Sequence, residues 1–207
     1  MIAAIQRLNE SVRATLAAHF LALPVKDRSL RFGMSLAPSV IAAYVDGIDF
    51  NRDAVFGVHD DHLALVGVAH VAFEDGVAEL GLSVLPAHRG RGIGGALFKR
   101  AAEHARNRCM PGLLMRCISR NAPIMHLAQR FGMDIVADGG DVDAHLKLPP
   151  ASPASIAREF LTDAFALYDR ALKALGRVAP RVRAQVDSTT GARTANHTAQ
   201  QGDIRGN

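Results

Sequence analysis

Short apolar runs separated by polar turns make up much of the first 148 residues. Their length and their content of Val, Ile and Ala are typical of strands. The runs that we interpret as strands cover residues 2–8, 53–59, 62–73, 77–85, 113–118, 135–137 and 142–148. Asp75-Gly76 lies between two of them and is a strong signal for a β-hairpin turn.

Other segments repeat their apolar residues at helical spacing. Asn9 is a suitable N-cap for a first helix that Pro24 ends, and Pro38 is suited to the first turn of a second. Asn121 is a suitable N-cap for a later one. The helices predicted on this basis cover 9–23, a segment that begins at 38, 93–108, 121–132 and 154–178. Strands and helices together predict an α/β protein with a mixed sheet.

The chain divides into a domain and a C-terminal extension. We expect one domain over 1–148, a stiff linker over 149–153 that carries three prolines, and an amphipathic helix over 154–178. The apolar face of that helix predicts packing against the domain or against a partner. Residues 179–207 are mostly polar and contain few large apolar side chains, so we predict a disordered tail.

Composition excludes several classes of protein. Hydrophobic residues make up 49% of the chain, which is sufficient for a packed core, and no run approaches the length of a membrane span. The N-terminus does not resemble a secretory signal, and the two cysteines lack metal-site spacing, so we expect a cytoplasmic protein without a metal. The net charge of +4 lies mostly in residues 151–207, where it is dilute and forms no basic stripe with interleaved aromatic residues, which argues against a nucleic-acid partner.

The segment with the clearest chemistry follows the strand over 77–85. Glycines crowd this loop, two arginines accompany them, and a helix follows; the residues in question are Arg89, Gly90, Arg91, Gly92, Ile93, Gly94 and Gly95. A glycine-rich backbone can approach a ligand closely, and a helix N-terminus attracts anions. Arginine side chains add forked donors that suit phosphate. The loop therefore predicts a pyrophosphate site.

Several kinds of ligand carry a pyrophosphate. A mononucleotide P-loop is excluded because the loop lacks the Lys-Ser or Lys-Thr pair that closes one. The string G-x-G-x-x-G over 90–95 satisfies a dinucleotide fingerprint, which would indicate an NADP-dependent oxidoreductase. However, four residues separate the strand from Gly90, and no carboxylate ends the next strand.

Arg89-x-x-Gly92-x-Gly94 resembles the acyl-CoA loop of the GCN5-related N-acetyltransferases, the GNAT family. The resemblance extends from about residue 2 to residue 148 and includes a second signature, which begins at Asn121 and ends at Gly132-Met133. It implies the GNAT acyl-CoA N-acyltransferase fold, which has a central, mostly antiparallel twisted sheet flanked by helices. It also implies acetyl-CoA as the acyl donor. A weaker resemblance, to bacterial protein-lysine acetyltransferases, involves Leu30-Arg31-Phe32.

The family resemblance implies a set of site residues. The strands over 77–85 and 113–118 would separate and admit the pantetheine arm between them. The residues that would bind acetyl-CoA are Leu82, Ser83, Val84, Arg89, Gly90, Arg91, Gly92, Ile93, Gly94, Gly95 and Asn121. Glu79 occupies the position of a catalytic glutamate and is the expected general base, although a solvent-facing glutamate at a strand entry is an equal alternative.

The sequence departs from the family at one catalytic position. Many members carry a tyrosine in the second signature helix as a general acid, and this chain has Ala128 there. His88 and His126 are the nearest histidines, and ordinary surface roles are favoured for both. Arg116 and Arg120 are candidates for contacts with the 3′-phosphate of the donor, although solvation at the surface is favoured for them.

We therefore expect an acetyl-CoA-dependent N-acetyltransferase that acts on a primary amine, such as a protein lysine or a small molecule. The missing tyrosine leaves open an inactive acyl-CoA-binding regulatory module. The predicted chain is a monomer or a homodimer without nucleic-acid or membrane partners.

Overall fold

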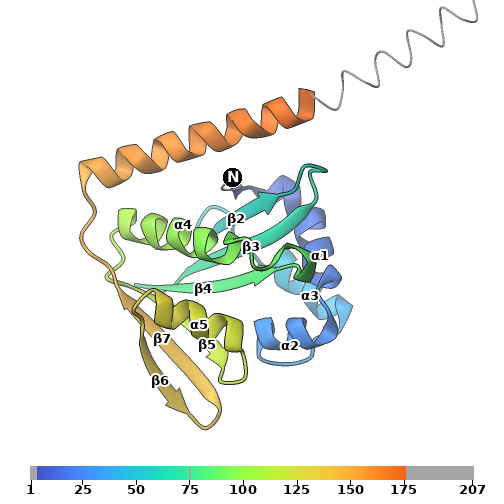
Figure 1. Cartoon of the computed structure of the whole chain (residues 1–207), viewed down its shortest axis with the longest axis vertical. Coiled ribbons are helices and arrows are strands. Elements are labelled where there is room, and N and C mark those ends of the chain that lie inside the picture. The colour runs from blue at the N-terminus through green and yellow to red at the C-terminus, as the bar shows by residue number, and fades with distance from the viewer. Residues whose placement is uncertain (1–3, 75, 176–207) are drawn as a thin grey trace, which may run out of the picture. The chain divides into compact units, whose positions relative to one another are not determined.

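The computed structural model describes residues 4–74 and 76–175, drawn in colour in Figure 1. The predicted tail over 179–207 lies outside the described residues. A first compact unit ends at Ala166, and a second begins at Leu167.

A seven-stranded sheet in the order β1-β2-β3-β4-β5-β7-β6 forms the centre of the first unit. Its strands are β1 (Ile5–Leu8), β2 (Ala54–His59), β3 (Leu65–Glu74), β4 (Val77–Val84), β5 (Gly112–Ile118), β6 (Asp134–Asp138) and β7 (Asp141–Lys147). Each neighbouring pair is antiparallel except β4 and β5, which are parallel. The predicted mixed, mostly antiparallel sheet is confirmed. A dinucleotide-binding fold would instead have a mostly parallel sheet.

The parallel strands β4 and β5 separate soon after they meet. Only two residue pairs join them, Ala78 with Leu113 and Glu79 with Leu114. Beyond these pairs, residues 80–84 continue to pair with β3, and residues 115–118 pair with β7. The main chain of β4 therefore has an unpaired edge toward β5. This is the separation that the family resemblance implied.

Helices cover both faces of the sheet. They are α1 (Arg13–Ala22), α2 (Val25–Phe32), α3 (Pro38–Asp46), α4 (Ile93–Asn107) and α5 (Ala122–Arg130), with short 3-10 turns η1 (Glu10–Val12) and η2 (Pro86–His88). Side chains of α4 and α5 pack in one apolar core with β2, β3 and β4. Side chains of α1 and α3 pack in a second core on the other face of the sheet. The sequence predicted these helices except α2, which follows α1 after Pro24.

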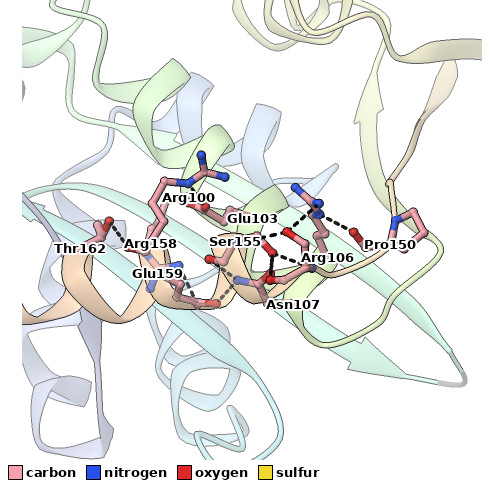
Figure 2. Close-up of polar contacts among 10 residues, drawn as sticks. Arg100, Glu103, Arg106, Asn107, Pro150, Ser155, Arg158, Glu159 and Thr162 are labelled. Carbon is pink, nitrogen blue, oxygen red and sulfur yellow. Dashed lines mark hydrogen bonds and ion pairs between the residues drawn. The ribbon is translucent and has the colours of Figure 1, made fainter.

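The first unit also contains the start of a helix over 153–175, whose residues up to 166 belong to it. Arg100 on α4, only 3% exposed, donates to Glu159 at 2.8 Å and to Asp163 at 2.6 Å. Asn107 donates to Glu159 at 2.6 Å, and Figure 2 shows this contact among the polar contacts between the two helices. Polar side chains make this contact with α4, while Phe160 on the apolar face is 73% exposed.

Candidate active site

The separation of β4 and β5 creates a cleft with a cavity at each end. The first cavity has a volume of about 350 Å³, and the second has a volume of about 710 Å³. The last residues of β4, the glycine-rich loop and the start of α5 line the first. The middle of β4, the end of β5 and the β6–β7 hairpin line the second. Helix α2 contacts both separated strands.

The glycine-rich loop forms one wall of the first cavity and leads directly into α4. Gly92 is the N-cap of α4 and has φ +79°, a conformation that side chains rarely adopt. The amides of the first helical turn have no partner within a helix, and the helix dipole makes this end positive. A Cβ at Gly90 or Gly92 would meet no other atom within 4 Å, so open space lies over the loop. This geometry fits a pyrophosphate.

Arg89 has protein partners within the same cavity. Its Nε donates to the carbonyl oxygen of Val84 at 3.0 Å, and its Nη2 pairs with Asp27 of α2 at 2.8 Å. The guanidinium therefore joins the loop to α2. An anion in the loop would compete with Asp27 for this cation.

Two polar side chains fix the walls of the first cavity. Asn121 is the N-cap of α5, where its side-chain oxygen accepts from Ile124, and its Nδ2 donates to the carbonyl of Leu30 at 3.2 Å. Ser83 lies 2.9 Å from Nε2 of the buried His19, whose Nδ1 lies 2.9 Å from the carbonyl oxygen of Leu65. Because the carbonyl only accepts, Nδ1 carries the proton and the Ser83 hydroxyl donates to Nε2. Burial lowers the pKa of His19 to about 4, and Arg31 adds to this effect.

Glu79 lies in the second cavity and is paired with an arginine. Its Oε2 is 3.1 Å from Nη1 of Arg116, whose Nε is 3.9 Å from Asp143. The side chain of Glu79 is 42% exposed, so it does not lie in an apolar environment. Asp138 and Asp141 also line this cavity, which gives its lining an excess of carboxylates over arginines.

The predicted cofactor-binding residues mostly line one cavity. Leu82, Ser83, Val84, Arg89, Gly90, Gly92, Ile93, Gly94 and Asn121 line the first, and so does His88. Arg91 and Gly95 are absent from both linings; Gly95 faces the ring of Phe131 instead. His126 and Arg120 are exposed at the surface.

Sequence reasoning assigned no role to Arg31, which lines both cavities. It lies on α2, and its Nη2 donates to the Tyr44 hydroxyl at 3.2 Å. Its only signal in the sequence was its place in Leu30-Arg31-Phe32, which supported a resemblance but suggested no chemistry.

Among the described residues, no group of three or more His, Cys, Asp or Glu side chains is arranged to hold a metal ion. No helix within 4–74 or 76–175 is long and apolar enough to cross a membrane.

Comparison with known proteins gives a consistent family. Residues 33–133 match the model of the acetyltransferase (GNAT) family. A stretch of 76 residues is 33% identical to a streptothricin acetyltransferase of Streptomyces lavendulae, and it covers 37% of this chain and 40% of that protein. The match therefore spans less than half of the length of that relative.

Solved structures show the same fold. The GNAT domain of PAT from S. lividans matches with a TM-score of 0.61 at 15% identity, over 72% of this chain and 95% of that chain. YncA from Salmonella typhimurium, solved with its cofactor acetyl-CoA, matches with a TM-score of 0.55 at 17% identity, over 72% of this chain and 96% of that chain. PaiA N-acetyltransferase from Thermoplasma acidophilum, in complex with coenzyme A, matches with a TM-score of 0.55 at 15% identity, over 71% and 99%.

Proposed function

The chain belongs to the acetyltransferase (GNAT) family, and from that premise we propose that it transfers the acetyl group of acetyl-CoA to a primary amine. The cleft between β4 and β5 is the observation that supports this most. One end of the cleft has the glycine-rich loop at the start of α4, and the other end has a carboxylate, Glu79. A donor and an acceptor that enter from opposite ends would meet beside Gly81.

Each part of the cleft has a role in this proposal. The amides of the loop and the first turn of α4 bind the pyrophosphate. The pantetheine arm lies along the unpaired edge of β4, where alternate residues present their N–H and C=O groups to the cleft. Ser83 and Asn121 remain the side-chain candidates for contacts with the arm. The amine reaches the thioester from the second cavity.

Glu79 is the proposed general base, acting directly or through water. Glu79→Gln should lower kcat by about 100-fold or more because a positioned base contributes roughly 10²–10⁴-fold. Asp143→Asn is the matched control, since Asp143 lines the same cavity and also approaches Arg116. It should leave kcat within a few fold. Equal losses in the two variants would contradict a specific role for Glu79.

The acetyl acceptor belongs to one of two classes. Likeness to the GNAT domain of PAT and the Leu30-Arg31-Phe32 segment support a protein lysine. The match to a streptothricin acetyltransferase and the carboxylates of the second cavity support a small amine with several positive charges. Thiol release with acetyl-CoA and a panel of lysine peptides, polyamines and cationic antibiotics would separate the two classes.

The same assay tests the proposal against an acyl-CoA-binding regulatory module. That alternative predicts tight binding of acetyl-CoA by calorimetry, no turnover with any amine, and no change in binding for Glu79→Gln. If acetyl-CoA neither binds nor raises the melting temperature, both functions are excluded.

A further inference from the structure

Arg31 lies where the two cavities meet. Among the described residues that line the cavities, it is common to both linings. The adjacent point on β4 is Gly81, and a Cβ added there would overlap the Arg31 guanidinium. The guanidinium therefore lies directly against the strand, at the level of the cleft where donor and acceptor would meet.

Aromatic rings fix the position of this cation. The Cζ atom of Arg31 lies 5.0 Å from the centroid of Phe32, 5.9 Å from that of Phe20 and 6.0 Å from that of Tyr44. Rings at these distances attract a guanidinium and replace part of its hydration. They leave few ways for the side chain to move within the cleft.

A chain of hydrogen bonds that begins at Nη2 orients the guanidinium. Nη2 of Arg31 donates to the Tyr44 hydroxyl at 3.2 Å, and Tyr44 donates to Nδ1 of His70 at 2.7 Å. Nε2 of His70 then donates to Asp53 at 3.1 Å, and Asp53 is 3% exposed. Burial and the charge of Arg31 lower the pKa of His70, which favours the neutral ring that this direction of donation requires. Each proton in the chain thus has a defined place.

The network leaves part of the donor capacity of Arg31 unused. Its Nε is buried and has no hydrogen-bond partner among the described residues. Buried polar groups without partners are rare in folded proteins, and a charged donor in a cleft suits an oxygen with negative charge.

We propose that Arg31 is a catalytic residue that donates hydrogen bonds to the carbonyl oxygen of the acetyl donor and stabilises the charge that develops on it. This inference rests on the proposed acetyl transfer. The amine nitrogen forms a bond to the carbonyl carbon, and the carbonyl π electrons move to the oxygen beside the guanidinium. The oxyanion then collapses, the C–S bond breaks and the thiolate leaves. The amine proton passes to Glu79 or water, and the thiolate takes up a proton.

Tyr44 acts through Arg31 and is a positioning residue. Neither cavity lining contains it. Its hydroxyl accepts from Nη2 and so fixes one edge of the guanidinium. Loss of this hydroxyl should misplace the cation without removing its charge.

Kinetics with matched variants tests the proposal. Arg31→Gln should lower kcat by about 100-fold, as expected for the loss of one preorganised oxyanion donor, and should change the Kd of coenzyme A less than threefold. Arg31→Lys keeps the charge but loses the planar fork of donors, so its kcat should lie between that of the wild type and that of Arg31→Gln. Arg28→Gln is the control on the same helix, because Arg28 lines neither cavity and donates only to the Leu21 carbonyl at 3.2 Å in the described structure. It should behave as wild type. Melting curves establish that each variant folds.

A second measurement does not depend on turnover. The probe is a ketone analogue of acetyl-CoA in which a methylene group replaces the thioester sulfur. Its carbonyl stretch should shift to lower frequency when it binds wild-type protein, and the shift should be absent in Arg31→Gln. Tyr44→Phe should reduce the shift in part and lower kcat about tenfold. Adding Tyr44→Phe to Arg31→Gln should not lower kcat further, because Tyr44 acts only through Arg31.

Three outcomes would overturn the proposal. If Arg31→Gln kept the wild-type kcat and bound coenzyme A more tightly, Arg31 would be a side chain that obstructs the cleft and not a catalytic residue. A raised KM for the amine with unchanged kcat would make it an acceptor-binding residue. An unshifted ketone carbonyl in the wild-type complex would also contradict it. Failure of the proposed function is a separate result: the wild type would release no thiol with any amine, even where the ketone probe still shows the Arg31-dependent shift.

Discussion

At the scale of single residues, Asp27 is the group most opposed to the proposed ligand. Its carboxylate lines the first cavity and pairs with Arg89, whose cation the pyrophosphate would otherwise attract. Asp27→Asn should therefore lower the Kd of coenzyme A, by about two- to fivefold, because a partly exposed ion pair is worth about 0.2–1 kcal/mol. Calorimetry with coenzyme A measures this directly. Arg89→Gln should have the opposite effect, and weaker binding in both variants would contradict the competition.

Single residues also show what sequence reasoning can and cannot reach. Arg89, Gly92 and Gly94 could be proposed as a phosphate site because the chemistry of such a loop lies within a few consecutive positions, and the three residues line one cavity. Arg31 could not, because its position depends on Gly81, fifty residues later in the sequence, which lacks a side chain. Glu79 could be singled out as a candidate base from its place in an apolar strand, but its partner Arg116 comes from another strand and could not be inferred from spacing.

At the scale of elements, the turn before α4 depends on a left-handed glycine. Gly92→Ala should destabilise the fold by about 1 kcal/mol, because alanine is strained at positive φ. It should also raise the Kd of coenzyme A at least tenfold, since the amides of this turn form the anion site. Gly76→Ala is a matched control, because Gly76 has φ +77° and also has no atom within 4 Å of a built Cβ. It should cost similar stability and leave the Kd unchanged. Equal effects on affinity would exclude this anion site.

The contact between α4 and the helix residues 153–166 provides a second test at this scale. Glu159→Gln should destabilise the contact by about 3 kcal/mol, because Arg100 would lose one of its buried partners. Hydrogen exchange of the helix amides over 153–166 measures the opening. Arg158 lies on the same helix as Glu159, and Arg158→Gln removes only a more exposed pair with Glu103 of α4, so it should cost less than about 1 kcal/mol. Equal exchange rates in both variants would show that the helix is held by other contacts.

Elements with a clear period were predictable, and those without one were not. The apolar pattern of the sequence predicted the four consecutive antiparallel strands β1 to β4, and it also predicted helix α4. Helix α2 was missed because none of its residues is fully buried, so it has no apolar stripe to signal it. For the helix that begins at residue 153, the apolar face was recognised, but the carboxylates of Glu159 and Asp163 make the contact. The spacing of apolar residues cannot show that the polar face makes the contact, because that contact depends on the buried Arg100 of another helix.

At the scale of the whole molecule, stability should fall in two stages on acidification. The folded pKa of His19 is about 4, below its ordinary value of 6.5, so the unfolded chain binds the extra proton first. Its contribution, about 3 kcal/mol, is present above pH 6.5 and is lost between pH 6.5 and about 4. Burial would raise the pKa of Glu159, but bonds from His104, Asn107 and Arg100 outweigh it and lower the pKa from 4.5 to about 2. The contribution of Glu159 is therefore lost below pH 4.5.

Denaturant unfolding at a series of pH values measures both stages. His19→Gln should weaken the dependence of stability on pH between 6.5 and 4, leaving the smaller part that belongs to the buried His70, and should not change the dependence below pH 4.5. Glu159→Gln should weaken the dependence below pH 4.5 and leave the dependence between pH 6.5 and 4. A wild-type protein with constant stability from pH 7 to pH 4 would contradict the burial of a neutral His19.

The polar contact between α4 and residues 153–166 has a consequence for heating. The cost of dehydrating charged groups falls as temperature rises, whereas the gain from burying apolar surface levels off. Arg100 and its two carboxylates should therefore contribute a growing share of the stability of the first unit as it warms.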